Sequence, residues 1–255
     1  MTDSSPNGLS IPANHPVAAA IVNAIREGDV DSVQAQLRSR PALAAARVVD
    51  RRGVSRSLLH VAADWPGHFP NAAQIVALLA TSGANVNSRV AHPDPTSPPE
   101  TPLHWAASSD DVAVIDALLD AGADIEAPGA VFTGGTPMSD AVVFARWAAA
   151  RRLLERGAAT TLWQSAALGL LDRVRDQCAT EPPPTAHELT NALWHACRGG
   201  QRSTAEHLLQ LGADPSWVGY DNKTAYQAAD ESGNTELAEW LRAGSAVSFR
   251  AEAGQ

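Results

Sequence analysis

The chain has 255 residues, of which 45% are hydrophobic and 18% charged, and its formal net charge at pH 7 is −9. Proteins that bind nucleic acid or anionic membrane surfaces normally present a basic face, whereas the arginine doublets Arg51-Arg52 and Arg151-Arg152 stand isolated in this sequence. We therefore expect neither nucleic acid nor a membrane among its partners.

The cysteines and the first residues of the chain indicate its cellular compartment and whether it holds a metal or cofactor. Cys178 and Cys197 fall in segments expected to be helical and have no metal-ligand spacing around them, so we expect buried thiols, no metal site and no cofactor. The first residues are polar and lack the cationic start and apolar core of a signal peptide. No apolar run approaches the roughly 18 residues of a membrane span. These features predict a cytoplasmic protein with a disordered leader over residues 1–14.

The first predicted element is a capping pair of helices over residues 16–27 and 30–38, joined by a Gly-Asp turn. Residues 41–55 follow as a projecting loop. Further along, a short helix opens at Thr101-Pro102, because proline is favoured in the first helical turn. A second, amphipathic helix ends at Gly122, which can adopt positive φ.

The heptapeptide Thr101–Ala107 recurs in worn form as Ser57–Ala63 and Thr136–Val142, and each copy is followed by a Leu-Leu pair and a Gly-Ala ending. This pattern resembles the ankyrin repeat, whose T-P-L-H-x-A opening and roughly 33-residue period are diagnostic. The resemblance implies an all-α fold: an ankyrin-repeat solenoid of about seven helix-turn-helix units with projecting hairpin fingers, over residues 15–243.

The remaining repeats are predicted in order along the chain. The second to fourth cover residues 57–91, 101–127 and 136–160, and a fifth begins at residue 162 and lacks a finger. Three prolines at 182–184 break it off, so we expect a bend or a sub-division near residue 160 and at 182–184. The sixth repeat covers residues 192–215, a polar last repeat covers 224–241, and residues 244–255 are predicted to be a disordered tail.

The second repeat departs most from the pattern. Residues 64–71 are an insertion that contains two prolines and a glycine, which exclude regular helix. The second finger, residues 88–100, is long and stiffened by prolines. We expect this repeat to carry the features that distinguish the protein.

The resemblance implies that one face of each inner helix lines a concave binding groove. The residues predicted to line it are Asp64, Trp65, His68, Trp105, Ser108, Ser109, Asp140, Phe144, His195 and Arg198. Charged residues at the finger tips, Arg51, Arg52, Arg89 and His92, are either solvated turn residues or anchors for a partner. The motif histidines His60 and His104 are expected to tie their helix starts to neighbouring backbone.

Two groove features admit more than one interpretation. Trp65 and Trp105 either fill space in the core or anchor a bound partner, since tryptophan is frequent at interface hot spots. Asp140 stands at a usually apolar position, where an acid must be paired, hydrogen-bonded or neutralised. It either caps backbone amides of a finger or pairs with Arg146, or it marks a polar binding site.

Two functions follow from these observations. The first is a non-catalytic interaction module that binds another protein through its groove and fingers. The alternative is a small-molecule-binding protein or unusual enzyme with a pocket between the 64–71 insertion, Trp105 and Asp140. In that case Asp64, His68 and Asp140 would perform acid–base chemistry. No G-x-S-x-G, P-loop, G-x-G-x-x-G or H-E-x-x-H motif is present.

Overall fold

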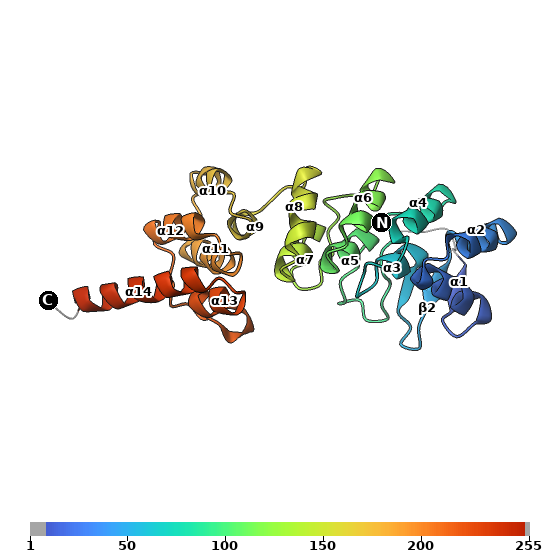
Figure 1. Cartoon of the computed structure of the whole chain (residues 1–255), viewed down its shortest axis with the longest axis horizontal. Coiled ribbons are helices and arrows are strands. Elements are labelled where there is room, and N and C mark those ends of the chain that lie inside the picture. The colour runs from blue at the N-terminus through green and yellow to red at the C-terminus, as the bar shows by residue number, and fades with distance from the viewer. Residues whose placement is uncertain (1–8, 253–255) are drawn as a thin grey trace. The chain divides into compact units, whose positions relative to one another are not determined.

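The structure is a computed structural model. It describes residues 9–252, with side chains as far as residue 243. These residues form fourteen α-helices and one small sheet, so the predicted all-α class is confirmed (Figure 1). The helices are α1 (Pro16–Glu27), α2 (Val30–Ser39), α3 (Leu58–Ala63), α4 (Ala72–Thr81), α5 (Pro102–Ser108), α6 (Val112–Asp120), α7 (Pro137–Val143), α8 (Trp147–Glu155), α9 (Leu162–Ala167), α10 (Leu171–Cys178), α11 (Ala186–Arg198), α12 (Arg202–Gln210), α13 (Ala225–Glu231) and α14 (Thr235–Glu252).

The chain divides into two compact units, residues 1–158 and 159–255, called here the N-terminal and C-terminal units. In the N-terminal unit the first helices of successive repeats pack on one another, α1 on α3, α3 on α5 and α5 on α7. The second helices form another layer, in which α4 packs on α6 and α6 on α8. The C-terminal unit repeats this arrangement with α9, α11 and α13 in one layer and α10 and α12 in the other.

Alanine lets the inner helices of the N-terminal unit approach closely. Leu103, Ala106 and Ala107 of α5 are fully buried, and Ile115 and Leu118 of α6 supply the facing apolar stripe. These are the positions at which the repeat motif requires apolar residues, and their spacing of three and four places them on one helix face. The residues that let each repeat pack closely on its neighbours are therefore part of the repeat motif itself.

The helix starts are fixed by capping boxes. In α3 the Ser57 side chain accepts a hydrogen bond from the backbone N–H of His60, and the His60 side chain accepts one from the N–H of Ser57. The same reciprocal pair occurs at α5, α9, α11 and α13, with histidine, glutamine or glutamate at the third position. Such pairs satisfy N–H groups that a helix start otherwise leaves without partners.

The first finger is a β-hairpin. Strand β2 (Arg47–Val49) pairs antiparallel with β3 (Ser55–Ser57) and parallel with β1 (Ser10–Pro12). A bridge between Ser55 and Ala91 joins this finger to the second one. Arg47 braces the junction by donating to the hydroxyls of Ser55 and Ser88, both at 2.8 Å.

Three predicted boundaries are corrected. β1 lies inside the predicted leader, because Ile11 is buried and its backbone pairs with Val48; residues 1–8 lie outside the described residues. Helix α14 continues through Gly244 into the predicted tail as far as Glu252, because no proline interrupts it; residues 253–255 lie outside the described residues. Helix α11 begins six residues before the predicted start at 192, because Thr185 and Glu188 form its capping box.

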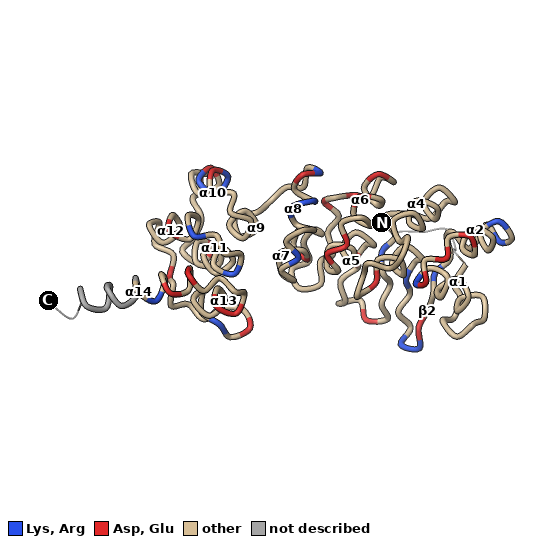
Figure 2. The backbone as a smooth tube through the Cα atoms, in the orientation of Figure 1, with Lys and Arg blue, Asp and Glu red and all other residues tan. Residues whose placement is uncertain are grey.

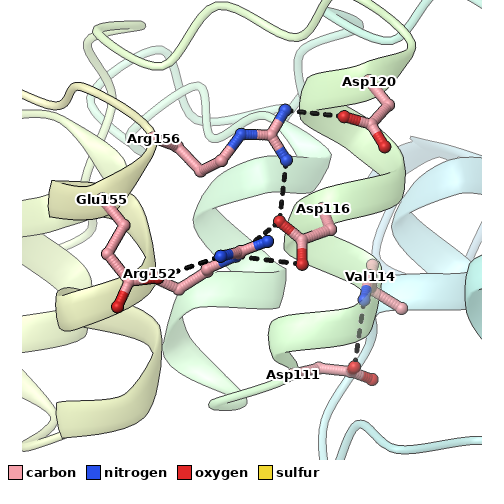
Figure 3. A network of polar contacts seen from close by, with 7 residues as sticks. All are labelled: Asp111, Val114, Asp116, Asp120, Arg152, Glu155 and Arg156. Carbon is pink, nitrogen blue, oxygen red and sulfur yellow. Dashed lines mark hydrogen bonds and ion pairs between the residues drawn. The ribbon is translucent and has the colours of Figure 1, made fainter.

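The outer helices α6 and α8 are linked by a network of ion pairs (Figure 3). Asp116 Oδ1 accepts from Arg152 Nε and from an Nη of Arg156, both at 2.7 Å, and Arg156 also reaches Asp120. Hydrogen bonds from Arg152 and Arg156 lower the pKa of Asp116 despite some burial. The network fixes the register of the fourth repeat on the third.

Replacing Asp116 with asparagine is expected to lower the free energy of unfolding at pH 7 by roughly 1 kcal/mol or less, because the three charged groups are partly exposed. The folded pKa of Asp116 is depressed, so this contribution is present above the unfolded pKa and is lost as pH falls through the folded value. Urea unfolding of the wild type and the variant at pH 7 and at pH 3 measures both effects. An equal difference at the two pH values would contradict the assignment.

Candidate functional site

The N-terminal unit contains a half-open pocket of about 330 Å³ beside Trp105. It is formed by the end of α3, the insertion after it, α5, the end of α7 and two fingers. We call it the Trp105 pocket; its lining residues are Asp64, Trp65, Glu100, Trp105, Ser108, Ser109, Val131, Phe144 and Arg146. Six of the ten predicted groove residues therefore meet in one place.

Trp105 is held between two repeats. Its ring meets the ring of His60 edge-on, with centroids 5.0 Å apart, and the Arg56 guanidinium lies 5.9 Å from its centroid. Burial raises the pKa of the neighbouring Glu100 carboxyl, and hydrogen bonding from the Trp105 side chain opposes that rise. Trp105 is half-buried, so one part of the indole packs on the neighbouring repeat and another lines the pocket.

The motif histidines are structural, as predicted. His104 Nδ1 accepts from the N–H of Thr101 at 3.1 Å, so in the neutral ring Nε2 carries the proton and donates to the carbonyl of Gly135 at 3.3 Å. His60 makes the equivalent bonds to Ser57 N–H and to the carbonyl of Glu100. Burial lowers the pKa of His60 to about 3 and that of His104 to about 4, so both are neutral at pH 7. Each imidazole joins a helix start to the finger of the next repeat.

Asp140 lies behind the pocket rather than in its lining, and its residue is only 1% exposed. Its Oδ1 accepts from the N–H of Val131 at 3.2 Å, while Oδ2 has no hydrogen-bond partner. Burial, reinforced by the charge of Glu100, raises the pKa of Asp140 to about 8, so the carboxyl is protonated at pH 7. The predicted capping of a finger amide is confirmed. Arg146 instead donates from Nε to the carbonyl of Ser108 at 2.8 Å.

The insertion 64–71 places its polar residues in separate environments. Asp64 pairs with Arg26 at 3.1 Å and with Arg56 at 3.7 Å. The His68 backbone N–H donates to the side chain of Asp111 at 2.7 Å, and the His68 residue is exposed. Asp64, His68 and Asp140, the residues of the acid–base hypothesis, are thus not brought together in one lining: only Asp64 borders the Trp105 pocket.

Glycine at position 67 lets the insertion approach α5. Its φ is +76°, and a Cβ added there would lie 2.7 Å from the Cβ of Ser109. Any side chain would therefore push the insertion away from the helix that carries Trp105. The position of Trp65 at the edge of the pocket depends on this contact.

Large apolar side chains are exposed around the pocket. Trp65 is 73% exposed and Phe132 is 71% exposed. The Phe132 ring packs on Phe144, with centroids 5.7 Å apart. Val131 lines both the Trp105 pocket and a second hollow of about 400 Å³ between the proline-rich second finger and the third finger, residues 124–135. The apolar surface is therefore continuous from α5 to the fingers.

Four of these residues were not predicted: Glu100, Val131, Phe132 and Arg146. They come from the loops that form the fingers and from the turn before α8, where helical periodicity carries no information. For Val131 and Phe132 a signal was present in the loop itself, since a Val-Phe pair between two glycines is unusual in a solvated turn. For Arg146 the sequence indicates only a possible pairing with Asp140.

The last two predicted groove residues, His195 and Arg198, belong to the C-terminal unit. His195 is buried between Trp163 and Trp194, at centroid distances of 4.6 Å and 5.1 Å, and burial lowers its pKa to about 3. The Arg198 guanidinium lies 5.8 Å from the centroid of the Trp194 ring. Trp194 takes the place of a motif histidine and donates its indole N–H to the carbonyl of Lys223 at 2.9 Å.

The predicted finger anchors differ in their contacts. Arg51 and Arg52 are exposed at the tip of the first finger, and His92 is half-buried in the second. Arg89 donates to the carbonyls of Pro99 at 3.1 Å and Pro128 at 2.7 Å. It therefore joins the second finger to the third. Figure 2 shows basic and acidic residues interspersed along both units.

Within residues 9–252, no three His, Cys, Asp or Glu side chains are grouped in a way that could hold a metal ion. Of the two free thiols, Cys197 is buried as predicted, whereas Cys178 is half-buried. None of the helices in the same described residues has both the length and the apolar character needed to span a membrane.

Comparisons with known proteins agree with the repeat pattern. The sequence model of the ankyrin repeat matches residues 100–130. The chain is 30% identical over 175 residues to the ankyrin repeat and KH domain-containing protein mask-1 of Caenorhabditis elegans. The aligned region covers 68% of this chain and 6% of that protein. A Caenorhabditis briggsae protein of the same description is 28% identical over 197 residues, covering 72% of this chain and 7% of the relative. The chain therefore spans a small part of each relative.

Proposed function

Because this chain is an ankyrin repeat protein, we propose that it binds a segment of another protein at the Trp105 pocket and the apolar surface beside it. Ankyrin repeats are generally protein–protein interaction modules. The observation that carries the proposal is the exposure of Trp65, which lines the pocket with Trp105, and of Phe132, which packs on the lining residue Phe144. Soluble proteins rarely leave adjoining large apolar side chains uncovered unless something binds there.

The shape of this surface favours a polypeptide over a small molecule. A ligand site is usually a cavity that encloses most of its ligand. Here the pocket is half-open, and the exposed Trp65 and Phe132 need a partner that extends beyond it. The adjoining finger hollow, which shares Val131, offers room for neighbouring residues of an extended segment.

Selection of short displayed peptides on the whole chain tests the proposal. Phe132→Ala and Trp65→Ala are each expected to weaken binding of the selected peptides by about 1–2 kcal/mol, or roughly tenfold, because both side chains are anchors. Both residues are largely exposed, so the fold should be unaffected. The control is Leu211→Ala, an exposed apolar residue of the C-terminal unit. If the control weakens binding as much as the anchor variants do, the peptides bind elsewhere.

A further inference from the structure

The Trp105 pocket contains an acidic group, Glu100, that forms no ion pair among the described residues. The pocket's other acid, Asp64, pairs with Arg26 and Arg56. Glu100 lines the pocket together with Trp105. Burial raises the pKa of Glu100, and hydrogen bonding from the Trp105 side chain acts in the opposite direction. An incoming cation would relieve the cost of holding a half-buried carboxylate.

The aromatic lining suits a cation. Aromatic faces attract ammonium and guanidinium groups, tryptophan most strongly. Trp105 already has the guanidinium of Arg56 near its ring, 5.9 Å from the centroid. Trp65 and Phe144 add further aromatic surface to the same pocket, which would pack on the aliphatic stem of a long basic side chain.

The charge of the chain acts in the same direction. With a net charge of −9 the protein attracts cationic partners over distances longer than a contact. Arg146 is the opposing group in the lining; its Nε is occupied by the carbonyl of Ser108. Glu100 therefore favours a cationic bound side chain, whereas Arg146 favours an anionic one. This difference allows a direct test.

We propose that the Trp105 pocket takes a lysine or arginine side chain of the partner, flanked by apolar residues, with Glu100 as the acceptor of its cationic group. This inference rests on the proposed function and names the chemistry of the partner. A basic, amphipathic segment would place its cation on Glu100 and its apolar residues on Trp65, Phe132 and Val131.

Three capped peptides of sequence Gly-Leu-X-Leu-Gly test this proposal, with lysine, norleucine or glutamate at X. Binding to the whole chain is followed by the NMR shifts of the Trp65 and Trp105 indole N–H groups. The lysine peptide is expected to bind about fivefold more tightly than the norleucine peptide, and the glutamate peptide most weakly. Glu100→Gln should remove the preference for lysine, and Arg146→Gln should strengthen it. Glu27→Gln, an exposed acid of the same unit outside the pocket, should change nothing.

The outcomes separate this proposal from the proposed function. Equal binding of the lysine and norleucine peptides, unchanged by Glu100→Gln, would overturn the cationic partner and leave an apolar docking pocket. Tightest binding of the glutamate peptide would overturn it in favour of Arg146. If none of the peptides shifts Trp65 or Trp105, both the cationic partner and the docking pocket fail.

Discussion

Asp140→Asn is expected to raise the free energy of unfolding of the N-terminal unit at pH 8 by about 3 kcal/mol. The pKa of Asp140 is about 8 in the folded chain against an ordinary 3.8, and at pH 8, where the folded carboxyl is half ionised, this difference costs about 5 kcal/mol. Asparagine avoids this cost, keeps an oxygen for the N–H of Val131 and leaves one amide group unpaired, which takes back about 2 kcal/mol.

The sign of the effect depends on pH. Between pH 4 and pH 8 the unfolded Asp140 is ionised while the folded carboxyl remains protonated. The contribution of Asp140 to the free energy of unfolding of the wild type therefore falls as pH rises. The advantage of Asp140→Asn should therefore grow across this range, vanish near pH 5 and become a deficit of about 1 kcal/mol at pH 4, where only the unpaired amide group remains. Hydrogen exchange of buried amides in residues 9–158 measures it in the whole chain. Asp116→Asn is the matched control, since it should destabilise at pH 8; a loss of stability in both variants would contradict the neutral Asp140.

Acidification is expected to destabilise the N-terminal unit strongly through His60 and His104. Their folded pKa values, about 3 and about 4, lie below the ordinary 6.5. As pH falls below 6.5 the unfolded chain binds protons that the folded chain does not, so stability is lost. At pH 4.5 the two residues together should cost about 5 kcal/mol relative to pH 7.

The chain itself offers the variant that isolates this effect. In α9 the histidine position is held by Gln164, which keeps the bond to the N–H of Thr161 at 2.8 Å and does not titrate. The double variant His60→Gln/His104→Gln should lose about 2 kcal/mol at pH 7, for two hydrogen bonds to finger carbonyls, and exceed the wild type at pH 4.5. Urea unfolding at both pH values should show the curves crossing; parallel curves would contradict the account. His92→Gln is the control.

Local signals were sufficient for most helices. The predicted helices 16–27 and 30–38 agree with α1 (Pro16–Glu27) and α2 (Val30–Ser39) to within one residue. Caps, apolar spacing and terminal glycines lie within each helix or next to it. The helices of one repeat can therefore be predicted from the sequence of that repeat alone. Helix α11 was missed at its start because the Thr185–Glu188 capping box was not recognised across the proline run.

The site was only half predictable, because it is built from parts of three repeats. Helical periodicity placed Trp105, Ser108 and Ser109 on the face that lines the pocket. Helical periodicity could not predict that Glu100 and Val131 line the pocket, because their positions depend on how the finger loops return to the helices. His68 was misplaced for a related reason: its backbone is tied to Asp111 of the next repeat, a contact distant in sequence.

The seven tryptophans provide the most direct test of the Trp105 pocket as the docking site. Their indole N–H signals report on both units in one NMR spectrum of the whole chain. Titration with a selected displayed peptide is predicted to shift Trp65 and Trp105 and to leave Trp194, Trp217 and Trp240 of the C-terminal unit unmoved. Shifts confined to the C-terminal unit, with Trp65 and Trp105 unchanged at saturation, would contradict the account.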